Sequence, residues 1–149
     1  MDWLRIIPMP ADFWAKLHGA STHFPIAMIF GACAFDGLAV LAWGKPLARN
    51  ASVAGKYTIL IGALGGLLAV VSGLTLTKGE LWGGGALRWH HRFVWPAFAL
   101  MVAAAVWRVS VGDRLTRRSY IAYLMVEIVL TGLVAAAGYW GGELLQGAS

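Results

Sequence analysis

Four long stretches of the chain are dominated by apolar residues, and short polar segments separate them. Each stretch supplies the roughly 20 apolar residues that an α-helix needs to cross the hydrocarbon core of a bilayer. Short connections between helices favour antiparallel neighbours. The pattern therefore predicts an all-α membrane protein, an up-down-up-down bundle of four transmembrane helices. The predicted spans are residues 22–43, 57–77, 89–107 and 120–142.

The composition agrees with a membrane location. The 149-residue chain is 59% hydrophobic and only 13% charged, whereas soluble domains carry roughly 25% charged residues. Four spans joined by short connections leave no room for a second domain. We therefore expect one four-helix transmembrane domain at residues 22–149, preceded by an interfacial segment at residues 1–21.

The start of the first helix is marked by residues that usually begin helices. Ser21 and Thr22 are typical N-cap residues, and Pro25 follows within what would be the first turn. The helix is therefore predicted to begin at residue 22 or 23, with His18 in the preceding segment. That segment lacks the continuous apolar run of a cleavable signal, so the first span is expected to direct insertion.

Basic residues concentrate in two of the connections, and their net excess gives the chain a formal charge of +5. Short loops rich in Lys and Arg stay cytoplasmic. Both termini and the connection at residues 79–88 are therefore expected outside, in the periplasm of a bacterium with an inner membrane. This distribution indicates topology, and no nucleic-acid partner is expected. The basic residues are Lys45, Arg49 and Lys56 in one connection and Arg108, Arg114, Arg117 and Arg118 in the other.

All four histidines lie near the outward ends of the first and third spans, as the pairs His18 with His23 and His90 with His91. These spans run in the same direction and lie diagonally opposite in an up-down bundle. One histidine from each pair can therefore meet across the axis, as bis-histidine haem ligation requires. Adjacent helix residues point about 100° apart, so only one of His90 and His91 can face the axis. On one continuous helix His18 and His23 would point about 140° apart.

The neighbouring residues favour haem over a bare metal ion. The chain has one cysteine and no local His-x-x-x-His or Cys-x-x-Cys pattern that would complete a tetrahedral site. Arg88 and Arg92 can pair with haem propionates. Four tryptophans offer flat apolar walls at the outer rim: Trp82, Trp89, Trp95 and Trp140. Simpler roles stay open, because tryptophans concentrate at membrane interfaces and histidines there can cap helices.

Two carboxylates lie inside the predicted spans, Asp36 in the first and Glu127 in the fourth. Each is roughly 10–12 Å from the cytoplasmic end at 1.5 Å per residue. Charge at that depth is costly, and such residues usually face the bundle interior and have partners. One interpretation is a shared-proton pair, or part of a proton path toward a quinone. The alternatives are a protonated structural hydrogen bond and the pairing of one carboxylate with Arg108.

Glycines recur along the second span, where Gly62 and Gly66 form a small-xxx-small pattern with Gly65 and Gly73 nearby. Such glycines allow close packing of membrane helices. They can also clear space for a flat cofactor against the backbone. The two interpretations do not exclude each other.

Several motifs resemble a known family. Residues 17–27, LHGASTHFPIA, with Asp36 downstream, the segment His91-Arg92-Phe93 and residues 138–144, GYWGGEL, resemble motifs of a bacterial four-helix membrane-protein family catalogued as a domain of unknown function. The resemblance covers residues 17–144. It implies a four-helix membrane domain, sometimes linked to c-type cytochromes, and it favours His91 over His90 as a ligand. The smaller residues on the helical face of His90 favour His90 instead.

These observations predict a haem-b-binding electron-transfer subunit rather than an enzyme with its own catalytic residues. His23 and His91 are the predicted axial ligands, with second roles for His18 and His90. The expected partners are a periplasmic c-type cytochrome or dehydrogenase subunit in a hetero-oligomer, quinone and membrane lipid. The alternatives are a non-redox membrane scaffold subunit and a metal-ion transporter.

Overall fold

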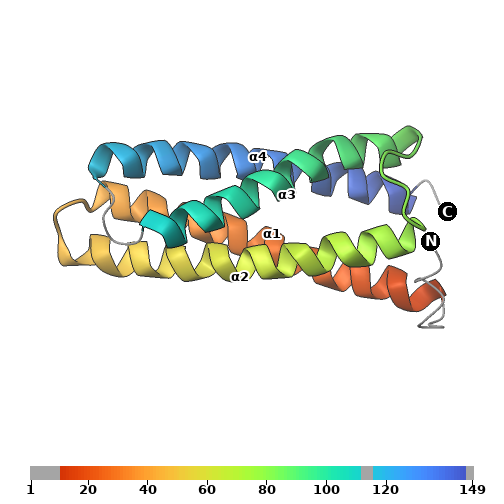
Figure 1. Ribbon diagram of the computed structural model, residues 1–149, viewed down its shortest axis with the longest axis horizontal. Coiled ribbons are helices and arrows are strands. Elements are labelled where there is room, and N and C mark those ends of the chain that lie inside the picture. The colour runs from red at the N-terminus through yellow and green to blue at the C-terminus, as the bar shows by residue number, and fades with distance from the viewer. Residues whose placement is uncertain (1–10, 112–115, 147–149) are drawn as a thin grey trace.

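The described residues form four helices that run along the length of the molecule, each antiparallel to the next (Figure 1). They are α1 (Ala11–Leu41), α2 (Pro46–Leu76), α3 (Gly85–Val111) and α4 (Arg117–Gln146). The computed structural model describes residues 11–111 and 116–146, so Arg114 lies outside the described residues. All four helices are long and apolar enough to cross a membrane. The predicted four-helix fold is therefore confirmed, although each helix begins before its predicted span, and α1 and α2 end one or two residues before theirs.

The helices pair as two hairpins. The most extensive contacts join α1 to α2 and α3 to α4, and smaller contacts join α1 to α4 and α2 to α3. Helices α1 and α3 are therefore diagonal, as the up-down-up-down arrangement predicts. We call the end with both termini and the α2–α3 connection the histidine end. The opposite end, with the α1–α2 and α3–α4 connections, is the loop end (Figure 1).

Helix α1 begins at Ala11, so the prediction that it starts at residue 22 or 23 is wrong. The hydroxyls of Ser21 and Thr22 do not cap a helix. They donate to carbonyls one turn earlier, those of His18 at 3.1 Å and Gly19 at 3.0 Å. Pro25 consequently lies inside the helix, where neighbouring helices and hydroxyl groups make proline tolerable in membrane proteins.

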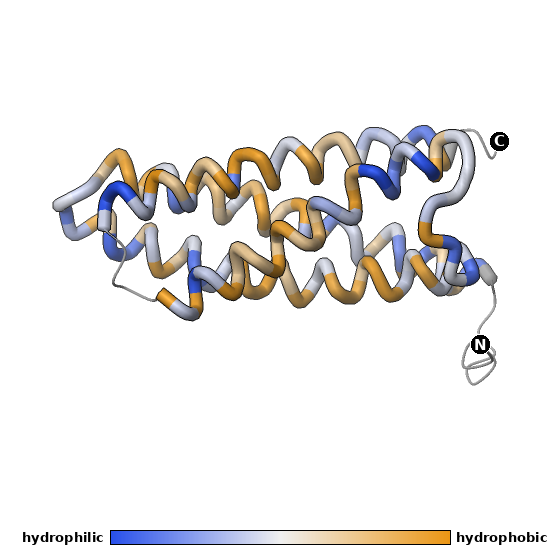
Figure 2. Tube along the Cα trace, turned by 45° about the horizontal axis from the view of Figure 1, so that its top comes forward, coloured by the Kyte–Doolittle hydropathy of each residue, from blue (hydrophilic) through white to orange (hydrophobic). Residues whose placement is uncertain are grey.

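Small and aliphatic side chains fill the centre of the bundle, whereas many large apolar side chains face outward. The principal core cluster is Ile29, Ala32, Ile59, Ala97, Met101, Ala104, Tyr123 and Leu130. Figure 2 shows hydrophobic residues along the middle of the bundle and hydrophilic residues gathered towards its two ends. This distribution suits a bundle whose middle is surrounded by lipid.

The glycines of α2 lie against side chains of neighbouring helices. A Cβ atom at Gly62 would lie 3.0 Å from the Cβ of Met28, and one at Gly66 would overlap the side chain of Met101. These two glycines therefore serve close helix packing. Gly73 differs from them, because its neighbour is the imidazole of His18.

Candidate functional site

His18 projects from α1 onto the backbone of α2. Its Nδ1 lies 3.0 Å from the carbonyl oxygen of Ala69 and 3.1 Å from the hydroxyl of Ser72. The ring rests against Gly73, where an added Cβ would come within 2.8 Å of the ring Cε1. Glycine at position 73 is therefore what allows the imidazole to approach α2 closely enough for this bond.

His90 is held in the same way in the second hairpin. Its Nδ1 lies 2.8 Å from the carbonyl oxygen of Ala137 in α4. The ring rests against Gly141, where a Cβ would lie 3.3 Å from the Nδ1. The carbonyl stands four residues before the glycine here, as Ala69 stands before Gly73 in the first hairpin. The two hairpins thus hold equivalent histidines by equivalent contacts.

This contact fixes the tautomer of both rings. A carbonyl oxygen only accepts hydrogen bonds, so the Nδ1 of His18 and the Nδ1 of His90 each carry the hydrogen. In the neutral ring Nε2 then retains its lone pair. A hydrogen bond from one ring nitrogen to a carbonyl is how proteins commonly orient histidines that bind metals through the other nitrogen.

His91 lies beside this pair and is only 7% exposed. Its ring centroid is 5.8 Å from that of His90 and 5.9 Å from that of Trp95. The Nδ1 of His91 is buried without a hydrogen-bond partner. His18 lies within electrostatic range of both His90 and His91. Three of the four histidines therefore gather inside the histidine end.

His23, by contrast, is exposed on the outer surface of α1. The physical reason is that α1 is continuous through both histidines, so the five-residue spacing turns their side chains about 140° apart. Because His18 takes the inward position, the structure does not bring His23 beside His91. The histidine of α1 that faces the bundle interior is His18.

Arg88 and Arg92 line a surface hollow of about 430 Å³ at the same end, together with Trp82 and Gly83. The guanidinium of Arg92 also lies 5.0 Å from the ring centroid of Trp89. Both arginines are exposed, so their charges are available to an anionic group at this end of the bundle.

The tryptophans of the histidine end do not all border the histidines. Trp95 lies beside His91 and donates from its Nε1 to the carbonyl of Leu81 in the α2–α3 connection, at 2.8 Å. Trp89 instead stacks on Trp140, with ring centroids 5.7 Å apart. Within residues 11–111 and 116–146, no group of three or more His, Cys, Asp or Glu side chains is arranged to hold a metal ion.

A second polar group is buried towards the loop end. The Nη2 of Arg108 donates to Asp36 at 3.1 Å, to the Ser52 carbonyl at 2.7 Å and hydroxyl at 2.8 Å, and to the Tyr120 hydroxyl at 2.7 Å. Tyr120 also donates to Asp36. Asp36 is 0% exposed and Arg108 is 2% exposed. The pairing of one carboxylate with Arg108 is thus confirmed, and it joins the diagonal helices α1 and α3.

Glu127 has no comparable partner. It is 1% exposed, and neither of its carboxyl oxygens has a hydrogen-bond partner. The hydroxyl of Tyr123 and the Oδ2 of Asp36 are also buried and unpartnered. Buried polar groups without partners call for a specific explanation, such as a bound proton or an ordered water. The two predicted carboxylates therefore lie in one buried region, but Asp36 is paired with Arg108 and Glu127 has no hydrogen-bond partner.

Four members of this region were not predicted from the sequence: Ser52, Gly55, Tyr120 and Tyr123. A Cβ atom at Gly55 would overlap the carboxylate of Asp36, so glycine is needed there. On α4 the signal was available, because positions 120, 123 and 127 recur at helical spacing and share one face. On α2 no polar pattern distinguishes Ser52 or Gly55 from ordinary packing residues.

Comparison with known proteins agrees with this architecture. A family model described as "Predicted membrane protein (DUF2231)" matches residues 15–147. Neither a curated protein nor a solved structure matches the chain. The matched range includes the buried His91, the half-buried His18 and His90, and the Asp36–Arg108 pair. The chain therefore belongs to DUF2231, a family of membrane proteins of unknown function.

Proposed function

We propose that this protein is a haem-b-binding electron-transfer subunit of a membrane complex, with His18 and His90 as the axial ligands. This assignment replaces His23 and His91 as the favoured pair. The observation that carries it is the matched support of the two imidazoles. Each Nδ1 bonds to a backbone carbonyl of the partner helix, and each ring lies on a glycine.

The residues present fit the chemistry of a haem iron. Two neutral imidazoles from separate hairpins supply the two axial nitrogens of a bis-histidine haem. The carbonyl bonds at Ala69 and Ala137 orient the rings and raise their basicity. The unpartnered Nδ1 of His91 gives the same region a third polar atom that can serve a bound group.

Haem b would supply one-electron transfer at the histidine end. Arg88 and Arg92 are the side chains suited to hold its propionates, because both are exposed cations at that end. We place this end in the periplasm of a bacterial inner membrane, since the basic connections of the loop end favour the cytoplasm. A periplasmic c-type cytochrome or dehydrogenase subunit and the quinone pool are the proposed redox partners.

Proton handling by Asp36 and Glu127 is part of the same proposal. The unpartnered oxygens of Glu127 and the free Oδ2 of Asp36 support it, because they can share or pass a proton. Tyr123 adds a hydroxyl to the same region. A quinone reduced at the membrane would need such a proton supply.

The visible spectrum of the protein, purified after expression with full haem supply, tests the proposal. We expect a reduced b-type alpha band, and we expect the haem-to-protein ratio to rise with haem supply to no more than one haem per chain. A folded, helical protein that shows no such band would overturn the proposal. That result would favour a non-redox scaffold subunit, whereas bound metal without haem would favour metal-ion transport.

A further inference from the structure

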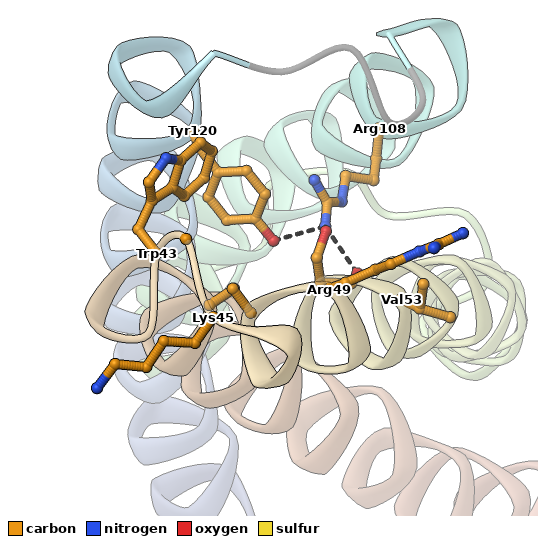
Figure 3. Close-up of a pocket in the computed structure, with 10 residues that line it drawn as sticks. Trp43, Lys45, Arg49, Val53, Arg108 and Tyr120 are labelled. Atoms are coloured by element: carbon orange, nitrogen blue, oxygen red, sulfur yellow. Dashed lines mark hydrogen bonds between the residues drawn. The ribbon is translucent and has the colours of Figure 1, made fainter.

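A cavity of about 480 Å³ opens at the loop end, remote from the histidines. It lies beside the α1–α2 connection and the first turns of α2, with α3 and α4 on the other side (Figure 3). Its lining includes Lys45, Arg49 and Arg108 and contains no carboxylate. Among the described residues, Asp36 lies next to this lining and is already bonded to Arg108. The cavity therefore carries an excess of positive charge.

The inner wall of the cavity has a fixed, buried donor. Arg108 is held through its Nη2 by Asp36, Ser52 and Tyr120. Its Nε is buried and has no hydrogen-bond partner. Figure 3 shows the hydrogen bond between the guanidinium and the Tyr120 hydroxyl at this wall. An unpartnered guanidinium donor is a ready partner for an anionic oxygen.

Two exposed cationic side chains and the start of α2 lie at the mouth of the cavity. Lys45 occupies the N-cap position of α2 with no side-chain capping bond, and Pro46 follows at the first turn. The N-terminus of a helix attracts anions through its free N–H groups and its dipole. Lys45 and Arg49 are exposed, and in Figure 3 they extend to either side of this turn. They can therefore turn towards a bound anion.

Apolar surface continues from the cavity towards the middle of the bundle. Val53 lines the cavity and begins a stripe of exposed apolar side chains on α2, namely Val53, Tyr57, Ile61, Leu64 and Leu68. Residues three and four apart share one face of a helix. A soluble anion would use only the polar cavity, whereas a phospholipid would use the cavity for its phosphate and the stripe for an acyl chain.

We propose that this cavity binds the phosphate of an anionic phospholipid in the leaflet that the loop end faces. Arg108 and the start of α2 contact the phosphate, Lys45 and Arg49 close over it, and an acyl chain follows the stripe. The site is independent of haem binding, because the apolar core cluster separates the two ends of the bundle.

The test compares lipid retention by native mass spectrometry after reconstitution into phosphatidylglycerol or phosphatidylcholine nanodiscs. The test variant is the double substitution Lys45→Ala with Arg49→Ala, which leaves the buried Arg108 contacts in place. The matched control is Arg117→Ala with Arg118→Ala, which removes equal charge from exposed positions at the same end that do not line the cavity. Inorganic phosphate tests whether the cavity binds a phosphate ion that carries no lipid.

We expect the wild type and the control to retain phosphatidylglycerol and not phosphatidylcholine. The test variant should bind phosphatidylglycerol about thirtyfold more weakly, at roughly fivefold for each basic side chain near an anionic lipid surface. Equal losses in the two double variants would overturn the proposal in favour of general surface charge. Unchanged retention by the test variant, or full displacement of the lipid by inorganic phosphate, would also overturn it.

Discussion

Asp36 and Glu127 are both buried, yet their surroundings give them different chemistry. Asp36 accepts from Arg108 and Tyr120 and can remain charged, because a guanidinium balances it. The carboxyl oxygens of Glu127 have no partner. An unpaired charge in the interior of a membrane bundle is costly. The neighbouring guanidinium therefore distinguishes the two carboxyls, because Asp36 has a charged partner and Glu127 has none.

This difference predicts that two isosteric substitutions change the free energy of unfolding by different amounts. Asp36→Asn leaves the buried charge of Arg108 unbalanced and should lower the free energy of unfolding by about 3–5 kcal/mol. Glu127→Gln keeps the size and neutrality of the side chain and should change it little. Thermal unfolding in detergent, compared with the exposed-site control Arg117→Ala, measures both. Equal losses in the two variants would show that Glu127 is also held as a paired charge.

The four helices could be predicted from hydropathy alone, but the start of α1 could not. Ser21, Thr22 and Pro25 are ordinary signals of a helix N-terminus. In the bundle the two hydroxyls bond to carbonyls of the preceding turn instead, and the helix continues back to Ala11. Backbone groups in an apolar environment must be hydrogen-bonded within the helix, and this requirement outweighs local signals for a helix N-terminus.

The choice among the histidines depended on the same helix boundary. With α1 continuous, the angular spacing separates His18 from His23, but only packing against α2 shows which one turns inward. The contact between His18 and Gly73 depends on the register between two helices. Hydrophobic patterns do not specify that register. The sequence could therefore indicate histidines and glycines as candidates without pairing them.

The helix contact at Gly73 gives a prediction of its own. Gly73→Ala places a Cβ within 2.8 Å of the His18 ring and should push the imidazole off the Ala69 carbonyl, costing about 1–3 kcal/mol. We expect a lower melting temperature and weaker haem retention. Gly132→Ala is the control, because its Cβ meets nothing within 4 Å and it gains the same helix propensity. Equal melting temperatures and equal haem retention in the two variants would show that Gly73 is not needed to position His18.

As a whole, the molecule has two polar regions at opposite ends of an apolar bundle. The buried His91 and the half-buried His18 and His90 lie at one end, and the Arg108 cluster with its basic cavity lies towards the other. The core cluster between them is apolar apart from the hydroxyl of Tyr123. Substitutions at the mouth of the basic cavity, such as Lys45→Ala with Arg49→Ala, should therefore leave haem binding intact.

The orientation of this bundle can be tested with single introduced cysteines in a Cys33→Ser background. Glu80→Cys lies in the α2–α3 connection and Asn50→Cys near the start of α2, and both positions are exposed. A membrane-impermeant thiol reagent should label Glu80→Cys in intact spheroplasts and label Asn50→Cys only after lysis. The reverse pattern would put the histidine end in the cytoplasm and would contradict the charge distribution of the loops.

Haem retention by three histidine variants tests the assignment of the site most directly. Reduced-minus-oxidised spectra would be recorded for His18→Ala, His90→Ala and His23→Ala, each purified as a folded helical protein with full haem supply. We expect the alpha band to be lost in His18→Ala and in His90→Ala and to be retained in His23→Ala, whose side chain is exposed. Retention of the band in His18→Ala or His90→Ala, or its loss in His23→Ala, would contradict the proposed ligation.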